Sequence, residues 1–173
     1  MKIKSKNLSG IFQIIKAELE HIDAISKLTE GKNLLSKTAK EITELRPNFL
    51  VLINEKNEVL GCVGSKYYNL DAEIISFRVL DEYQGQGFGK KLLKKIIQNL
   101  ETDKKLRIFS LTTRAVAEIH FFPSGFFEVG IQLFNLKVSE VCKKCPKNII
   151  LNNQHQCNEI AVLYKGKETL VTE

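Results

Sequence analysis

Three glycines stand at every second position in the sequence FRVLDEYQGQGFGKKLL, which covers residues 77–93. An apolar run precedes them, and an apolar run studded with lysines follows. The first turn of a helix exposes backbone N–H groups without helical acceptors, together with the positive end of the helix dipole. Glycines before such a turn allow positive φ angles and a close approach of the backbone to a ligand. The segment therefore predicts a cradle for an anion, most simply a phosphate group.

Two familiar phosphate-binding loops are excluded by spacing. A P-loop needs G-x-x-x-x-G-K followed by Ser or Thr, whereas GQGFGKK is too short and ends in Lys91. A dinucleotide-binding fingerprint needs a third glycine where Lys90 stands, and it normally follows the first strand of its unit. Here a large part of the chain precedes the glycines.

The chain has 173 residues, of which 43% are hydrophobic and 27% charged, as expected for one globular domain over residues 1–173. No apolar run approaches the roughly 20 residues that a membrane helix needs, and charges interrupt the N-terminal apolar segment too early for a signal peptide. We therefore expect a cytoplasmic protein with no membrane partner. Its cysteines are expected to be reduced thiols or metal ligands rather than disulfides.

The formal net charge is +6, and the basic excess lies just after the glycines, which favours an anionic ligand. A basic patch would also suit nucleic acid, but the aromatic residues are not interleaved with the lysines. We therefore expect no nucleic-acid partner, and a solvated helix face accounts for most of these lysines. The sequence leaves the oligomeric state open, a homodimer included.

Hydrophobic periodicity predicts the order of the elements. Helices are expected over residues 16–30, 33–45, 88–100 and 114–122, and strands over residues 72–80, 106–113, 126–134 and 159–165, with a hairpin over residues 49–68 that turns at 54–57. The antiparallel hairpin and the lack of regular β–α alternation predict a mixed α/β domain rather than a doubly wound sheet.

The motif Q-x-x-G-x-G is formed by Gln84, Gly87 and Gly89 and resembles the pyrophosphate-binding motif of the GCN5-related N-acetyltransferase (GNAT) superfamily, whose members bind acetyl-CoA. The surrounding ISFRVLDEYQGQGFGKKLL is similar to that superfamily's fourth strand, loop and third helix, and AEIHFFPSGF to the following helix and strand start. The resemblance to the GNAT fold spans nearly the whole chain. A glycine turn with only a structural role is the alternative.

By this resemblance, the backbone N–H groups of Gln84 to Gly89, here called the glycine loop, hold the pyrophosphate, and Lys90 and Lys91 add charge. The strand ending at Val79 pairs with the pantetheine amides and separates from its neighbour to admit the thioester, whose carbonyl is polarised by nearby N–H groups. The residues expected to bind the cofactor are Phe77, Val79, Gln84, Gly85, Gln86, Gly87, Phe88, Gly89 and Lys90.

Within the superfamily, the segments GKNLLSKTAKEI, VLGCVG and LTTRA are similar to the catalytic domain of N-acetylglutamate synthases, and the cysteine-containing tail is similar to that of their short, single-domain versions. This resemblance implies acetyl transfer to the α-amine of an amino acid, glutamate or glutamine, the first step of arginine biosynthesis. Two alternatives stay open: a GNAT enzyme acting on a protein N-terminus, lysine or polyamine, and a non-catalytic regulator that binds acyl-CoA.

An amino-acid substrate needs cations for its carboxylates. The candidates are Lys37, Arg78 and Arg114. Lys37 stands where the resemblance leads us to expect an arginine, and a lysine cannot make the planar bidentate fork of a guanidinium. Arg114 ends a strand, where a ligand role and a surface role are both open. Arg78 lies in the central strand, where it can also face solvent or pair with an acid.

An α-amino group has a pKa of about 8, so a base is useful at neutral pH. By the resemblance, Glu73 occupies the strand position of that base, and an exposed acid at a strand start is the alternative. Many relatives protonate the leaving thiolate with a tyrosine in an FY pair. Here the pair is Phe121–Phe122, which has no hydroxyl, so the general acid is not identified. His120 is expected on the helix surface.

Four residues of the tail match zinc ligands in type, because three thiolates and one imidazole can form a tetrahedral site. They are Cys142, Cys145, His155 and Cys157. The H-x-C spacing is tight for two ligands of one ion, and the alternative is a reduced loop over about residues 139–158, between the last two strands, that shapes the substrate end of the site. Cys62, between apolar neighbours, is expected to be a core thiol.

Overall fold

The computed structural model describes residues 10–30, 36–103, 106–145, 150–151, 154–155 and 157–166, and at positions 144, 150–151 and 154–155 it describes the backbone alone. Within these ranges the elements follow in the order β1 (Gln13–Lys16), η1 (Leu19–His21), α1 (Ile22–Thr29), α2 (Ala39–Leu45), η2 (Arg46–Asn48), β2 (Phe49–Ile53), β3 (Val59–Tyr68), β4 (Asp71–Val79), η3 (Asp81–Tyr83), α3 (Phe88–Leu100), β5 (Arg107–Thr113), α4 (Arg114–Val116), η4 (Ala117–Phe121), η5 (Phe122–Ser124), β6 (Phe126–Val129), η6 (Ile131–Leu133), α5 (Asn135–Glu140), η7 (Cys142–Lys144), β7 (Ile150–Leu151), β8 (Gln154–His155) and β9 (Glu159–Tyr164).

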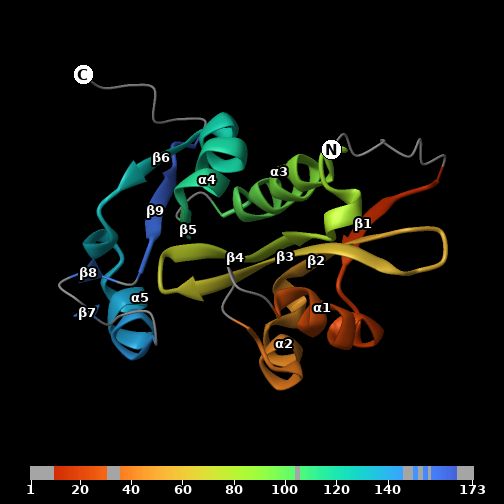
Figure 1. The fold of residues 1–173 in the computed structure, drawn as a ribbon, viewed down its shortest axis with the longest axis horizontal. Helices are drawn as coiled ribbons and strands as arrows, with labels where there is room; N and C mark the ends of the chain where they lie inside the picture. The colour runs from red at the N-terminus through yellow and green to blue at the C-terminus, as the bar shows by residue number, and fades with distance from the viewer. Residues whose placement is uncertain are drawn as a thin grey trace.

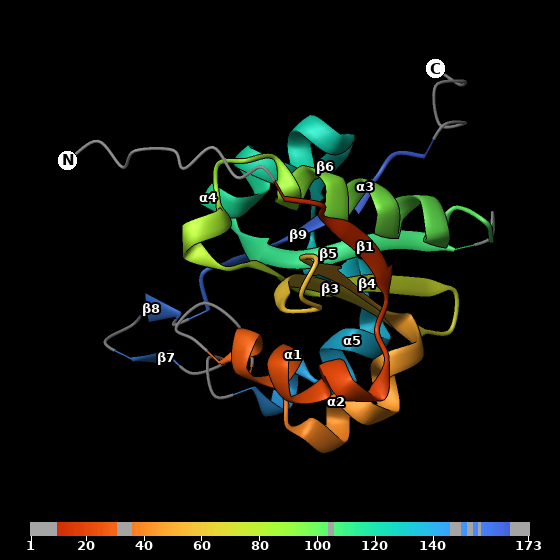
Figure 2. The ribbon, with the colours of Figure 1, turned by 90° about the vertical axis from the view of Figure 1, so that its right-hand side faces the viewer.

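The main sheet has the strand order β1-β2-β3-β4-β5-β9-β6, and β7 and β8 pair separately. Neighbouring strands of the main sheet run antiparallel except for β4 and β5, which run parallel. Figures 1 and 2 show α3 and α4 on one face of the sheet and α1, α2 and α5 on the other. This architecture confirms the mixed α/β fold class expected from the sequence.

Helix α3 spans the residues predicted for it. Its apolar side chains recur every three or four residues and so share one face. That face packs on β2, β3 and β4 and contains the buried residues Phe88, Leu92, Leu93, Ile96, Ile97 and Leu100. Among the helices of the described ranges, none combines the length and apolar character needed to cross a membrane.

The N-terminal helices are shorter than the periodicity predicts. The chain before α1 pairs as β1 with β2, and the N–H of Ala17 extends this pairing by donating to the Phe49 carbonyl at 2.9 Å. Helix α2 begins after Thr38, whose hydroxyl accepts the N–H of Glu41 while the Glu41 carboxylate accepts the Thr38 N–H. This reciprocal cap sets the start of the helix. The predicted helical residues 33–35 lie outside the described ranges.

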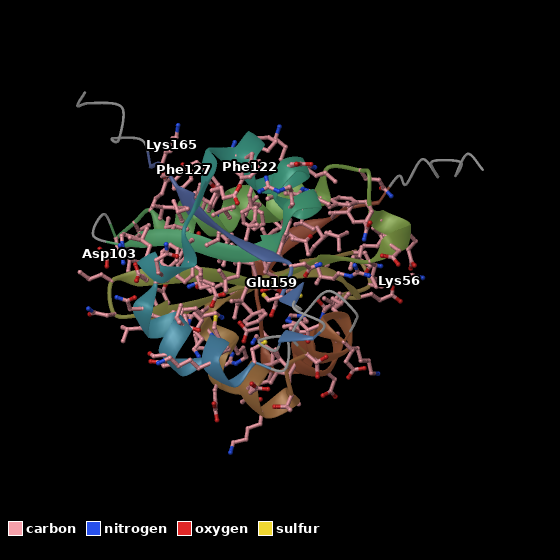
Figure 3. All side chains as sticks on the ribbon, turned by 60° about the vertical axis from the view of Figure 1, so that its left-hand side comes forward. Lys56, Asp103, Phe122, Phe127, Glu159 and Lys165 are labelled. Atoms are coloured by element: carbon pink, nitrogen blue, oxygen red, sulfur yellow. The ribbon has the colours of Figure 1, made fainter. Side chains whose placement is uncertain are left out.

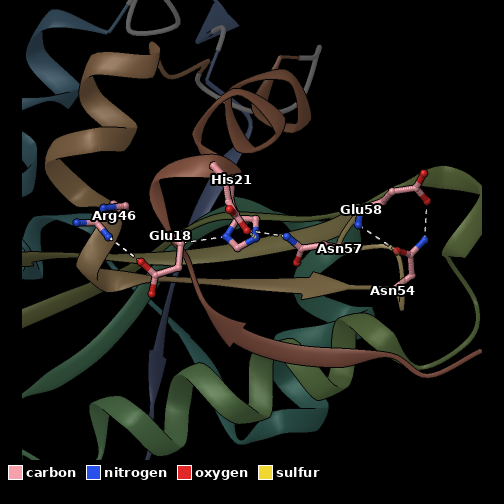
Figure 4. A network of polar contacts seen from close by, with 7 residues as sticks. Glu18, His21, Arg46, Asn54, Asn57 and Glu58 are labelled. Carbon is pink, nitrogen blue, oxygen red and sulfur yellow. Dashed lines mark hydrogen bonds and ion pairs between the residues drawn. The ribbon is translucent and has the colours of Figure 1, made fainter.

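A polar network joins this helical layer to the β2–β3 turn (Figure 4). Arg46 contacts the Glu18 carboxylate at 3.3 Å, and the Nδ1 atom of His21 accepts the Glu18 N–H at 2.9 Å. Asn57, in the turn, donates to the Glu20 carboxylate at 2.6 Å. These contacts hold the start of α1 against the hairpin.

The chain after β6 departs from the strand predicted over residues 126–134. β6 ends at Val129, a 3-10 turn follows, and then comes α5, a helix that the periodicity did not predict. Phe134, just before α5, is buried and stacks on Phe109 of β5 with ring centroids 3.8 Å apart. This long-range contact holds α5 against the sheet.

An ion pair joins β4 and β5 where they are paired. The Arg107 guanidinium bonds both carboxylate oxygens of Asp71, at 2.6 and 2.9 Å, and the Asp71 side chain is 10% exposed. We expect Asp71→Ala to lower the free energy of unfolding by about 1–2 kcal/mol, because a bidentate pair is lost while the half-exposed guanidinium regains water. Chemical denaturation measures this loss. The control Glu128→Ala removes an exposed pair with Arg114 and should cost under about 0.5 kcal/mol, so equal losses would contradict this account.

Candidate functional site

The parallel strands β4 and β5 pair briefly and then separate. Asp71–Glu73 pair with Arg107–Phe109, and β5 then continues beside β9. Just beyond this pairing, the Ser110 hydroxyl donates to the Ile74 carbonyl at 2.9 Å. A bulge follows in β4, where Ser76 has a φ of 53° and the register with β3 shifts. Among the residues that the structure describes, no strand pairs with the remainder of β4 on its β5 side.

The separated part of β4 presents backbone groups on that open side. Backbone groups of successive strand residues point in alternate directions. The Leu80 N–H donates to the Leu60 carbonyl of β3 at 2.9 Å, so the backbones of Phe77 and Val79 point away from β3. These are the two strand residues predicted to meet the pantetheine. The Val79 carbonyl accepts the side-chain amide of Gln84 at 3.0 Å, which ties the glycine loop to the strand end.

The glycine loop has the conformation that its sequence predicts. Gly85 and Gly87 have φ angles of 76° and 80°, and a Cβ on either residue would meet nothing within 4 Å. The Lys91 N–H donates to the Gly87 carbonyl at 3.1 Å, so the N–H groups of residues 88–90 precede the first helical bond of α3. The Gln84 N–H is not open to a ligand, because it donates to the Asp81 carbonyl at 3.2 Å. The set of N–H groups open to an anion is therefore shorter than the stretch predicted from Gln84 onward.

His120 lies beside this cradle rather than on an open helix surface. It is half-buried and packs edge-on against Phe77, with ring centroids 5.2 Å apart. A Cβ added to Gly89 would lie 3.3 Å from the His120 ring. Burial lowers the pKa of His120, so its imidazole is neutral at pH 7. The side chain thus closes the space between the start of α3 and β4.

The helical segment after β5 supplies no hydroxyl at the FY position. Phe121 is buried and packs edge-on against Phe77 and Phe126. Phe122 is half-buried and lies near the end of this segment, on the same side of the molecule as Phe127 (Figure 3). Neither phenylalanine can donate a proton to a leaving thiolate.

Glu73 lies at the point where β4 and β5 separate, on the face of the sheet covered by α5. Its carboxylate accepts the Lys137 ammonium at 2.8 Å and the Tyr68 hydroxyl at 3.3 Å. The Glu73 and Lys137 side chains are 4% and 7% exposed, so the alternative of an exposed strand-start acid is wrong. The Lys66 ammonium lies 4.9 Å from the centroid of the Tyr68 ring. Burial and the Glu73 charge raise the pKa of Tyr68, which keeps its hydroxyl protonated.

Lys37 belongs to the same electrostatic cluster. Its carbonyl accepts the Ser26 hydroxyl at 2.9 Å, which holds the segment before α2 beside α1. Burial lowers the pKa of Lys37, and the charges of Lys137 and Lys66 act in the same direction, while nearby carboxylates, among them Glu73, oppose the shift. Three lysines therefore lie within electrostatic reach of one buried carboxylate.

The other two predicted substrate ligands have partners elsewhere. Arg78 donates to the Asp81 carboxylate at 2.9 Å, beside the glycine loop. Arg114 donates to the Glu128 carboxylate at 2.7 Å, and both of these side chains are exposed. The structure thus brings Lys37 to Glu73 but engages the two arginines in separate ion pairs.

The zinc prediction finds no support in the described part of the chain. There, no group of three or more His, Cys, Asp or Glu side chains could hold a metal ion, and the His155 side chain lies outside what is described. Burial raises the pKa of the Cys142 thiol, which is close enough to sense the Lys137 and Glu73 charges. The four zinc ligands predicted from the sequence were Cys142, Cys145, His155 and Cys157.

Cys62 is a core thiol, as predicted. It is fully buried, its thiol donates to the Ser76 carbonyl at 3.3 Å, and burial raises its pKa to about 12. A thiol so protected is inert at neutral pH.

A hollow of about 300 Å³ lies elsewhere, between the C-terminal half of α3 and strands β1 to β3. Its lining includes Lys16, Ser65 and Asn99 and none of the predicted site residues. The hollow is therefore not part of the predicted site.

The comparisons with known proteins agree with this geometry. The model of the Acetyltransferase (GNAT) family matches residues 12–126. An uncharacterized N-acetyltransferase of Chlorobaculum tepidum is 30% identical over 152 residues, which are 85% of this chain and 92% of that protein. The chain therefore belongs to the acetyltransferase (GNAT) family.

Solved structures share the fold at lower identity. The N-acetylglutamate synthase of Neisseria gonorrhoeae, complexed with coenzyme A and N-acetyl-glutamate, superposes with a TM-score of 0.70 at 21% identity and covers 89% of this chain. This chain spans only 35% of that enzyme. A Mycobacterium tuberculosis protein in complex with CoA and NLQ has a TM-score of 0.69 at 22% identity, covering 88% of this chain and 98% of that one.

Three residues beside Glu73 were not predicted from the sequence: Tyr68, Lys66 and Lys137. The hairpin register could have revealed Lys66, because it lies directly opposite Glu73 in the β3–β4 pairing. Lys137 carried no such signal, since it lies in an unpredicted helix far along the chain from Glu73.

Proposed function

We propose that this chain transfers the acetyl group of acetyl-CoA to the α-amine of a free amino acid, most simply glutamate or glutamine. The observation that carries the proposal is the buried Glu73 carboxylate, with Lys37, Lys66 and Lys137 around it, where β4 and β5 separate. A carboxylate suits the ammonium group of an amino acid, and lysines suit its carboxylates. A polyamine would meet repulsion from the same lysines.

Acetyl-CoA supplies the acetyl group as an activated thioester. The N–H groups of residues 88–90 and the α3 dipole hold its diphosphate, as the N-terminus of a helix binds anions. The backbones of Phe77 and Val79, which point away from β3, bond the pantetheine and polarise the thioester carbonyl. The cofactor thus lies on the α3 side, and the acceptor approaches from the side of α1, α2 and α5.

Glu73 is the base of the proposed reaction. Its carboxylate takes one proton from the substrate ammonium, directly or through a water, so that the nitrogen gains a free electron pair. A C–N bond forms to the acetyl carbon, the C–S bond breaks, and the second proton of the amine neutralises the CoA thiolate. This route needs no tyrosine at the position of Phe122.

Two neighbours in structure support the choice of acceptor. One is named as an N-acetylglutamate synthase bound to coenzyme A and N-acetyl-glutamate, and the other is bound to CoA and NLQ. Arginine biosynthesis, as the pathway that this reaction would serve, and a cytoplasmic location belong to the same proposal.

An acceptor screen tests the proposal. Purified protein is incubated with acetyl-CoA and each of the common amino acids, an N-terminal peptide, and a polyamine, and acetylated products are identified by mass spectrometry. We expect acetylated glutamate or glutamine at the highest rate. Faster acetylation of the peptide or polyamine would contradict the proposal, and CoA binding without any product would favour the regulator.

A further inference from the structure

We infer that Lys66 and Lys137 together recognise a carboxylate of the acceptor, so that the site selects amines that carry a negative group. This inference rests on the proposed function, because it specifies the acceptor class of the same site. Neither lysine was among the substrate ligands expected from the sequence.

The two ammonium groups lie against one aromatic ring. Lys66 and Glu73 are directly opposite in the antiparallel β3–β4 register, so their side chains leave the same face of the sheet. The Nζ atoms of Lys66 and Lys137 lie 4.9 and 5.8 Å from the centroid of the Tyr68 ring. Tyr68 also donates its hydroxyl to Glu73 at 3.3 Å. The sheet register and the position of α5 thus bring both cations to the carboxylate that is the proposed base.

The charges around Glu73 complement those of an α-amino acid, which carries both an ammonium group and a carboxylate. Glu73 and Lys137 form a buried pair, and Lys66, which is half-buried, adds a further positive charge beside it. An α-amino acid can place its ammonium against Glu73 and its carboxylate against the lysines. A polyamine has no carboxylate, and in a protein N-terminus the adjacent carboxylate is replaced by an amide. Both therefore lack the group that the lysines would bind.

Two acidic side chains besides Glu73 act on the cluster. Glu41 is held in the α2 cap by Thr38, and its charge acts on Lys37 and Lys66. Glu140, at the end of α5, is exposed, and its charge raises the pKa of Tyr68 less than the charge of Glu73 does. Lys37 adds a further positive charge on the α2 side.

Lys66 is the better residue for a test. Lys137→Met would leave a buried carboxylate without its partner and is expected to destabilise the fold. Lys66→Met removes a half-buried charge next to a ring that the methionine can still contact, and Lys66→Arg keeps the charge. Lys95→Met is the matched control, because Lys95 is exposed on α3 and takes no part in the site.

The experiment compares kcat/KM for glutamate with that for its α-amide and its γ-amide, with acetylated products quantified by mass spectrometry. We expect wild-type protein and Lys95→Met to prefer glutamate over at least one of the two amides, and Lys66→Met to lose about 10-fold of that preference, mainly through KM. Lys66→Arg should keep most of it.

Unchanged preferences over both amides in Lys66→Met, with glutamate still acetylated, would overturn the inference and leave the proposed function standing. If wild-type protein acetylates a peptide or polyamine but no amino acid, the proposed function fails and the inference fails with it. A purely structural role for Lys66 would lower kcat/KM for all three acceptors alike, which also counts against the inference.

Discussion

Gly87→Glu is expected to weaken the binding of acetyl-CoA by at least about 10-fold, seen as a raised KM. Gly87 caps α3 with a φ of 80°, a conformation that costs other residues about 1–2 kcal/mol. Its Cβ position is open, so a side chain there meets no steric obstacle and stands next to the N–H groups at the start of α3. A glutamate then adds a negative charge where the diphosphate must lie. Initial rates at varied acetyl-CoA concentration measure the effect.

Gly87→Lys is the matched control, because it carries the same backbone cost but a positive charge. We expect it to retain much more affinity for acetyl-CoA than Gly87→Glu. If the two variants bind acetyl-CoA equally well, the loop does not hold the diphosphate and backbone strain alone accounts for the loss.

The second large effect is expected for Glu73→Gln, which should lower kcat by about 100-fold or more at pH 7. Glutamine can still accept the Lys137 hydrogen bond but cannot take a proton from the substrate. The α-carboxylate of a free amino acid raises the pKa of its ammonium group above the value of about 8 that a peptide α-amine has. The neutral fraction of the acceptor therefore grows steadily between pH 7 and pH 9.5, so the base is needed less at the higher pH. The ratio of wild-type to variant kcat should therefore fall as the pH rises. Rates across this pH range measure that ratio.

Glu118→Gln is the control for Glu73→Gln, because it removes an exposed carboxylate on the helical segment after β5. It should leave kcat unchanged. A loss in Glu73→Gln that is the same at every pH would show that Glu73 acts only as the partner of Lys137. Thermal unfolding of both variants separates that outcome from loss of folded protein.

The features that depend on local sequence were predictable. The apolar stripe of α3 and the glycines before it determine the helix limits Phe88–Leu100 and the positive φ angles of Gly85 and Gly87. The β2–β3 hairpin follows in the same way from two apolar runs around an Asn-rich turn. In these cases the residues that form the sequence pattern and the residues that contact one another lie close together in the chain.

The features that depend on distant contacts were not predictable. Lys137 meets Glu73 across 64 positions, and α5 is held by the stacking of Phe134 on Phe109. β1 is a strand because it pairs with β2, which lies further along the chain. The proposed acceptor side of the site is built from such contacts, which is why Lys137 was not among the predicted site residues.

Calorimetric titration of the wild-type protein with coenzyme A, and in parallel with pantetheine, tests the central claim most directly. The two ligands share the thiol arm, but only coenzyme A carries the diphosphate that the start of α3 is proposed to grip. The account predicts clear binding heat for coenzyme A and far weaker binding of pantetheine. Equal affinities, or no heat from coenzyme A at millimolar concentration, would contradict it.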